Sequence, residues 1–220
     1  MRKDGCPMTI SPLHVGDQVV VEHEHFQQLL AALRSRGYEV VGPTVRDGAI
    51  VYDVLTSVAD LPAGYTDEQD GGSYRLKTRG DKALFGYAVG PHSWKKFLHP
   101  PIIRLWQAKR EGDGFHITPE NHAAPKYAFL GVRSCELHAI AIQDRVFLWA
   151  DYTDPTYQSR RDDLFIVAVN CGQAGGTCFC VSMQTGPKAT FGFDLALTEV
   201  LEANRHSFVV QVGTETGQKS

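Results

Sequence analysis

Two short apolar runs restrict the fold of this chain more than any other feature of its sequence. They are KYAFLGV at residues 126–132 and LFIVAVN at residues 164–170. Continuous apolar runs of this length are typical of strands buried on both faces, as in parallel sheets. The stretch RSCELHAIAIQDRVFLWA between them has a helical period. This order predicts an α/β (mixed α+β) fold, with an open mixed sheet flanked by helices and β-hairpins.

The segments around these runs predict further helices and hairpins. Residues 22–36 carry leucines and a phenylalanine at helical spacing and are followed by Gly37, a natural helix stop. The pair Asp47-Gly48 favours a tight hairpin turn. The other expected elements are an irregular loop over 59–73, strands over 74–79 and 83–90, a short helix from Ser93 to Pro100, a hairpin turning at 112–114, a short helix over 154–163 and, in 193–213, two strands or a strand and a helix.

Composition and charge limit the class of protein. We expect an irregular N-terminal segment over residues 1–18, one domain over 19–213 and a tail over 214–220. Hydrophobic residues make up 43% and charged residues 21% of the chain, which is typical of a soluble globular protein. A net charge of −3 argues against a nucleic-acid partner. The sequence has neither an apolar run long enough to span a membrane nor a secretory signal, so the cytoplasm is the predicted location.

Three of the five cysteines lie within NCGQAGGTCFC, residues 170–180. Cys171 directly follows the second apolar run, and Cys135 lies three residues after the end of the first. Both are therefore expected at the carboxyl ends of strands, the edge where open α/β sheets bind ligands. In a reducing compartment, clustered cysteines indicate a metal site or catalysis rather than disulfides. Cys6 has no neighbouring cysteine, and we assign it no role.

Four thiolates suit either a tetrahedral zinc ion or a [4Fe-4S] cluster. Structural zinc sites commonly use Cys-x-x-Cys pairs, and this chain has none. Cys178 and Cys180 are one residue apart, which in extended backbone places both sulfurs on one face several ångströms apart and favours two irons of one cluster. The glycines between Cys171 and Cys178 allow close backbone approach. Zinc, and a redox-active Cys178–Cys180 dithiol, remain as alternatives.

Four further residues are candidates for supporting roles. His138 shares a helix face with Cys135, so it is a candidate fourth or replacement ligand, with a hydrogen-bond donor to the site or a plain surface residue as the alternatives. Arg133 is expected either to place positive charge beside an anionic cluster or to be an exposed residue in a salt bridge. Lys95 and Lys96 form a small basic group that is either a solvated helix face or a docking site.

Several long blocks of the sequence resemble one protein family. They are GVRSCELHAIAIQDRVFL at 131–148, DPTYQSRRDDLFIVAVNCGQAGGTCFCVSMQTGP at 154–187, LPAGYTDEQDGGSYRL at 61–76 and GPHSWKKFLHPP at 90–101. The family is that of the beta subunits of soluble nickel-iron hydrogenases (sulfhydrogenases) and the related A subunit of anaerobic sulfite reductase. The resemblance implies an iron-sulfur electron carrier in which Cys135, Cys171, Cys178 and Cys180 bind the cluster.

The resemblance also implies partners. A subunit of this kind passes electrons between a ferredoxin-like module and flavin-bearing and nickel-iron or sirohaem-bearing subunits, without catalysing a reaction alone. Two departures stand out: Ser134 and Glu136 replace the family's usual Pro and Asp, and the two CxxCxxCxxxCP runs of the family's ferredoxin domain are missing. We therefore expect a fragment, or a reduced form, that corresponds to the N-terminal domain. A zinc-stabilised assembly domain without redox activity is the alternative function.

Overall fold

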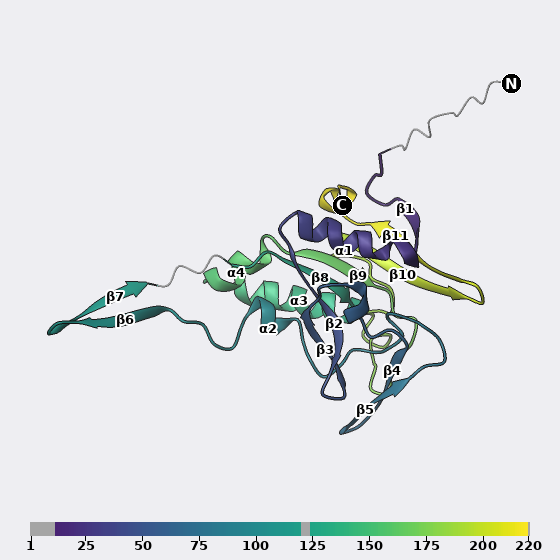
Figure 1. Ribbon diagram of the computed structural model, residues 1–220, viewed down its shortest axis with the longest axis horizontal. Coiled ribbons are helices and arrows are strands. Elements are labelled where there is room, and N and C mark those ends of the chain that lie inside the picture. The colour runs from purple at the N-terminus through teal and green to yellow at the C-terminus, as the bar shows by residue number, and fades with distance from the viewer. Residues whose placement is uncertain (1–11, 120–123, 220) are drawn as a thin grey trace.

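A seven-stranded mixed sheet forms the centre of the computed structural model, which describes residues 12–119 and 124–219 (Figure 1). The strands are β1 (Gln18–Glu22), β2 (Glu39–Arg46), β3 (Ala49–Val54), β8 (Tyr127–Val132), β9 (Phe165–Val169), β10 (Leu195–Glu202) and β11 (Arg205–Val212), in the order β1-β11-β10-β9-β8-β2-β3. The central strands β10, β9, β8 and β2 run parallel, and the strands beyond them pair antiparallel. The predicted mixed sheet is confirmed.

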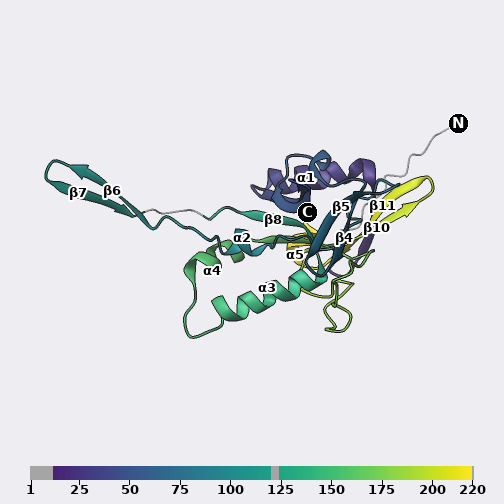
Figure 2. The ribbon, with the colours of Figure 1, turned by 90° about the horizontal axis from the view of Figure 1, so that it is seen from below.

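Helices cover both faces of this sheet. They are α1 (Phe26–Ser35), α2 (Lys95–Leu98), α3 (Ser134–Phe147), α4 (Pro155–Arg161) and α5 (Glu215–Gln218), with 3₁₀ turns at His23–His25 and Val58–Asp60. In Figure 2, α1 lies on one side of the sheet and α3 and α4 lie on the other. No helix in the described ranges is long and apolar enough to cross a membrane.

Alternate side chains of β9 enter two different cores. Phe165, Val167 and Val169 pack in the cluster that contains the apolar side chains of α1. Ile166 and Ala168 pack in the cluster that contains the apolar side chains of α3. Both faces of β9 are therefore buried, which explains why its sequence is a continuous apolar run rather than an alternating one.

Two further hairpins lie outside the sheet, and one of them corrects a prediction. The hairpin of β6 (Trp106–Glu111) and β7 (Gly114–Pro119) turns where the sequence indicates. Residues 65–70 were expected in an irregular loop, but they form β4 (Tyr65–Asp70), which pairs with β5 (Ser73–Thr78). The strand is polar along most of its length, so its sequence lacks the apolar alternation that indicates a strand.

The strand predicted over residues 83–90 is also wrong, because side chains rather than a neighbouring strand satisfy its backbone. The nitrogens of Leu84 and Phe85 donate to the carboxylate of Glu199 at 2.7 and 2.9 Å. The guanidinium of Arg133 donates to two carbonyl oxygens of the same segment. The segment is apolar and buried without any ladder of its own.

The ends of the chain contain two elements that the sequence did not predict. β1 begins at Gln18, within the expected N-terminal segment, and pairs antiparallel with β11 at the edge of the sheet. Residues 1–11 of that segment lie outside the described residues. Of the two arrangements predicted for residues 193–213, the pair of strands is confirmed as the β10–β11 hairpin. The short helix α5 follows, where no element was expected.

Candidate metal centre

The four predicted cysteines line one cavity of about 520 Å³. Cys135 lies in the first turn of α3, which begins just after β8. Cys171 lies two residues after the end of β9, the parallel neighbour of β8. Cys178 and Cys180 follow in the same connection, and all four are free thiols. The structure thus brings the four together, whereas Cys6 lies outside the described residues.

The connection from β9 to β10 is unusual for two parallel strands. Such crossovers normally contain a helix, yet residues 170–194 form only turns and bends. The side chain of Asn170 accepts from the nitrogen of Ala189 and donates to Thr198, both at 2.8 Å. Phe179 and Val181, by contrast, are 70% and 72% exposed at the cavity mouth. Long ordered segments without regular structure are commonly functional.

Burial keeps the deeper thiols of the cavity protonated in the metal-free chain. Desolvation raises the pKa of Cys135 to about 12, and the neighbouring Glu136 and other cysteines act in the same direction. Desolvation also raises the pKa of Cys171, while the positive charge of Arg133 opposes that rise. Thiolates at these positions therefore require compensating positive charge, which a bound metal centre provides.

Arg133 is buried, so the predicted alternative of an exposed arginine is wrong. Only 1% of its surface is accessible. Its Nη2 donates to the carbonyl oxygens of Phe85 at 2.8 Å and Tyr87 at 3.0 Å, and its Nη1 donates to that of Asn170 at 3.4 Å. Its Nε makes no hydrogen bond to any residue that the structure describes. The buried cation therefore holds the segment over 83–90 against the start of the cysteine connection.

Glu136 closes the first turn of α3. Its carboxylate accepts from the backbone nitrogen of Arg133 at 2.8 Å and from the hydroxyl of Tyr52 at 2.6 Å. Burial raises the pKa of this carboxyl group. The two bonds fix the start of the helix that presents Cys135 to the cavity.

The β4–β5 hairpin forms one wall of the cavity through Gln69. The amide of Gln69 donates to the carbonyl oxygen of Val89 at 2.8 Å, and it accepts from the hydroxyl of Thr177 at 2.9 Å. Glycine is required where the cysteine connection meets this wall, because a Cβ at Gly176 would lie 2.3 Å from the carbonyl oxygen of Gln69. The predicted close backbone approach thus occurs at Gly176.

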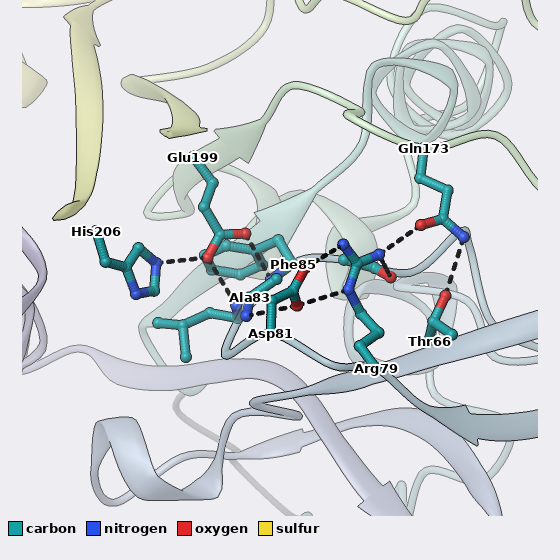
Figure 3. A network of polar contacts seen from close by, with 10 residues as sticks. Thr66, Arg79, Asp81, Ala83, Phe85, Gln173, Glu199 and His206 are labelled. Carbon is teal, nitrogen blue, oxygen red and sulfur yellow. Dashed lines mark hydrogen bonds and ion pairs between the residues drawn. The ribbon is translucent and has the colours of Figure 1, made fainter. Parts of the chain in front are cut away.

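A polar network ties the cysteine connection to the same hairpin (Figure 3). Arg79 donates to Oε1 of Gln173 at 2.5 Å, and Nε2 of Gln173 donates to the hydroxyl of Thr66 at 3.0 Å. Two bonds to Asp81 orient the guanidinium of Arg79. No local pattern predicts the roles of Gln69, Arg79 and Gln173, because their partners across this site lie far away along the chain.

The remaining candidates lie away from the cavity lining. The ring of His138 packs edge-on against Phe191, with centroids 4.7 Å apart. Lys96 donates to the carbonyl oxygen of Tyr52 at 2.6 Å, so part of the basic group on α2 is engaged within the fold. Lys95 is exposed on the same short helix. A docking role for these lysines stays a prediction.

The donor atoms do not form a preassembled site for one ion. Within residues 12–119 and 124–219, no three cysteine, histidine, aspartate or glutamate side chains are grouped so that they could hold a single metal ion. A cluster makes a different demand on its ligands, because each thiolate binds a separate iron. Four cysteines spread around one cavity are compatible with that demand.

An α/β domain with four cysteines around one cavity is a candidate iron-sulfur domain. A comparison with known proteins identifies a protein of similar sequence. The chain is 37% identical over 207 residues to the "Sulfhydrogenase 2 subunit beta" of Pyrococcus furiosus. The match covers 91% of this chain and spans about half the length of that relative. No model of a protein family and no solved structure gives a significant match. The chain is a homologue of a hydrogenase beta subunit, and the predicted resemblance to that family is confirmed.

Proposed function

We propose that this chain is an iron-sulfur electron-transfer component of a hydrogenase-type complex. In this proposal Cys135, Cys171, Cys178 and Cys180 hold one [4Fe-4S] cluster. The observation that carries it is the convergence of four cysteines, from two strand ends and one long connection, on a single cavity of a sulfhydrogenase homologue. When bound, such a cluster supplies one-electron redox chemistry at a potential set by its surroundings.

The chain's own residues would tune and orient that centre. Arg133 places a buried positive charge beside Cys171, which favours the thiolate form. Its Nε has no partner among the described residues and is available as a donor. The nitrogen of Gly175 lies 3.3 Å from the sulfur of Cys178, within the range for an amide-to-sulfur hydrogen bond. Together these donors supply the charge and hydrogen bonds that raise the reduction potential of a cluster.

The open side of the cavity supports a path for electrons to another subunit. Cys178 is exposed, and the exposed apolar side chains of Phe179 and Val181 line the same cavity. A partner docked there would approach the centre without a thick layer of protein between them. We propose that the exchange partners are a ferredoxin-like module and flavin-bearing and nickel-iron or sirohaem-bearing subunits, since the homologue is named as a hydrogenase subunit.

Anaerobic purification followed by iron, sulfide and zinc analysis tests this proposal. We expect about four irons and four sulfides per chain, and an electron paramagnetic resonance signal after reduction with dithionite. Cys171→Ser should remove most of both, whereas Cys6→Ser, to which the proposal assigns no role, should leave both unchanged. Stoichiometric zinc without iron would replace the proposal by a zinc-stabilised assembly domain. A folded chain without metal would instead indicate a Cys178–Cys180 dithiol.

A further inference from the structure

The β6–β7 hairpin projects away from the rest of the molecule in both views (Figures 1 and 2). Every residue of its two strands is exposed. A two-stranded hairpin of this kind has little stability of its own in water, because it cannot bury enough apolar surface. The hairpin, here called the arm and defined as residues 106–119, therefore lacks a core within the part of the chain that the structure describes.

The pairing register sorts the side chains of the arm into an apolar and a polar face. Successive residues of a strand point to opposite sides, and directly paired residues share a side. One face consists of the pairs Trp106–Pro119, Ala108–Ile117 and Arg110–Phe115, and the other consists of Gln107–Thr118, Lys109–His116 and Glu111–Gly114. The ion pair between Lys109 and Glu111, at 3.9 Å, lies on the polar face as this assignment requires.

The apolar face exposes large side chains that a monomer gains nothing by presenting to water. The exposed fractions are 57% for Trp106, 71% for Phe115 and 60% for Ile117. Leu105, directly before the arm, is 71% exposed. Exposed apolar groups gathered on one face mark an interaction site, and aromatic residues are the side chains that most often dominate binding energy at interfaces.

We propose that the apolar face of the arm docks on a different subunit, in an apolar groove that carries a carboxylate opposite Arg110. Arg110 is the one charged side chain on this face. Docking would bury its guanidinium, and an unpaired buried charge is costly. A carboxylate on the partner resolves that cost with a bidentate pair and fixes the register of docking.

A second copy of this chain fits the face less well. Two arms packed face to face would bury two copies of Arg110, and the face contains no aspartate or glutamate to neutralise them. The acidic residues of the arm, Glu111 and Asp113, lie on the polar face and in the turn. Charge complementarity therefore favours a foreign partner. The inference does not depend on the proposed cluster, because the arm and the cysteine cavity share no residue.

Site-specific photo-crosslinking in the assembled complex tests the proposal. The full chain, tagged and produced in its source cells, would carry benzoylphenylalanine in place of Phe115, or in place of His116 as the opposite-face control. We expect irradiation to link position 115, and not position 116, to one other polypeptide at a peptide that contains apolar and acidic residues. A link to a second copy of the chain, to lipid, or equally from both positions would overturn the proposal.

Paired variants give a quantitative test on the same complex. Replacing Phe115 and Ile117 together by Ser should lower recovery of the crosslinked subunit at least about tenfold, whereas His116→Ser with Thr118→Ser should leave it nearly unchanged. Arg110→Glu should also lower it, through repulsion of the partner's carboxylate. Unchanged recovery in all three variants would refute docking by this face. Iron content and the reduced-state spectrum should be the same throughout, so failure of the cluster proposal would appear separately.

Discussion

The hairpins β4–β5 and β6–β7 are built alike but are used differently. Each has two strands of six residues. In the first, the buried carboxylate of Asp67 accepts from the nitrogen of Ala88 at 2.6 Å, and Gln69 bridges Val89 and Thr177. In the second, no residue of either strand is buried or half-buried. The two hairpins thus share their strand length and pairing, and the contacts of their side chains with the rest of the domain distinguish them.

The polarity of the two hairpins is the reverse of what burial alone would suggest. The anchored hairpin is held by polar side chains that satisfy backbone groups of a neighbouring segment, and the projecting arm carries the larger apolar face. Burying a polar side chain is favourable only where its partners are already in place, so β4 fits one location on this chain. An apolar face has no such geometric demand and is available to another molecule.

The largest expected effect is at Arg133, which holds the segment on which the β4–β5 hairpin rests. Arg133→Met leaves the carbonyl oxygens of Phe85 and Tyr87 without their donor in a buried site. Hydrogen bonds to charged groups contribute about 1.5–3 kcal/mol each, so we expect the free energy of unfolding to fall by about 3 kcal/mol or more. Denaturant titration of the purified chain measures it.

Arg145→Met is the matched control, because Arg145 lies exposed on α3, the helix that begins directly after Arg133. A surface substitution of this type changes the free energy of unfolding by less than about 0.5 kcal/mol. Equal losses in the two variants would mean that Arg133 does not anchor the segment, and that the contrast between the hairpins has another cause.

The next effect concerns the contact between the cysteine connection and β4. Gly176→Ala places a Cβ 2.3 Å from the carbonyl oxygen of Gln69, so the connection must move away from the wall. Overpacking of this kind costs about 1–3 kcal/mol. Gly172→Ala is the control, since no atom lies within 4 Å of the position of its Cβ. We expect the midpoint of thermal unfolding to fall for Gly176→Ala alone. Equal midpoints in the two variants would show that β4 shifts to make room for the added methyl group without loss of stability.

Much of the fold was predictable because its signals are local. The apolar runs that became β8 and β9 show burial on both faces, and the turn at Asp47-Gly48 has the positive φ angles of 49° and 73° that this pair favours. β4 was missed because its contacts, not its own side-chain pattern, make it a strand. Residues 83–90 were misassigned because Glu199 and Arg133 supply bonds that a strand would take from its neighbours.

The candidate site likewise has residues whose positions local sequence signals predict and residues whose positions they do not. Cys135 and Cys171 were expected to meet because each follows an apolar strand, and the carboxyl ends of neighbouring parallel strands lie together. The burial of Arg133 was not predictable, since its carbonyl partners lie 48 and 46 residues away along the chain. Gln69 bonds Thr177 across 108 residues. Contacts of this range are decided by how the hairpin and the sheet are placed, which no local pattern records.

A smaller effect is expected from the hydrogen bonds of the anchored hairpin itself. Gln69→Leu removes the donor to the carbonyl oxygen of Val89 and the acceptor for Thr177. The free energy of unfolding should fall by about 1–2 kcal/mol, the usual cost of leaving a partly buried polar group unpaired. Gln107→Leu makes the same change on the polar face of the arm, where we expect almost no loss. A comparable loss at Gln107 would contradict the view that only the first hairpin is anchored.

The smallest effect on the stability of the rest of the domain is expected from removing the arm altogether. Trp106 and Pro119 are directly paired, so the two ends of the deletion begin side by side and a short glycine linker can bridge them. Because the arm buries nothing in the described fold, its loss should change the free energy of unfolding by less than about 0.5 kcal/mol and leave the iron content unchanged. Association with the partner subunit should be lost in the same variant. A large fall in stability would show instead that the arm stabilises the rest of the domain. The two hairpins would then differ only in how much each contributes to the free energy of unfolding.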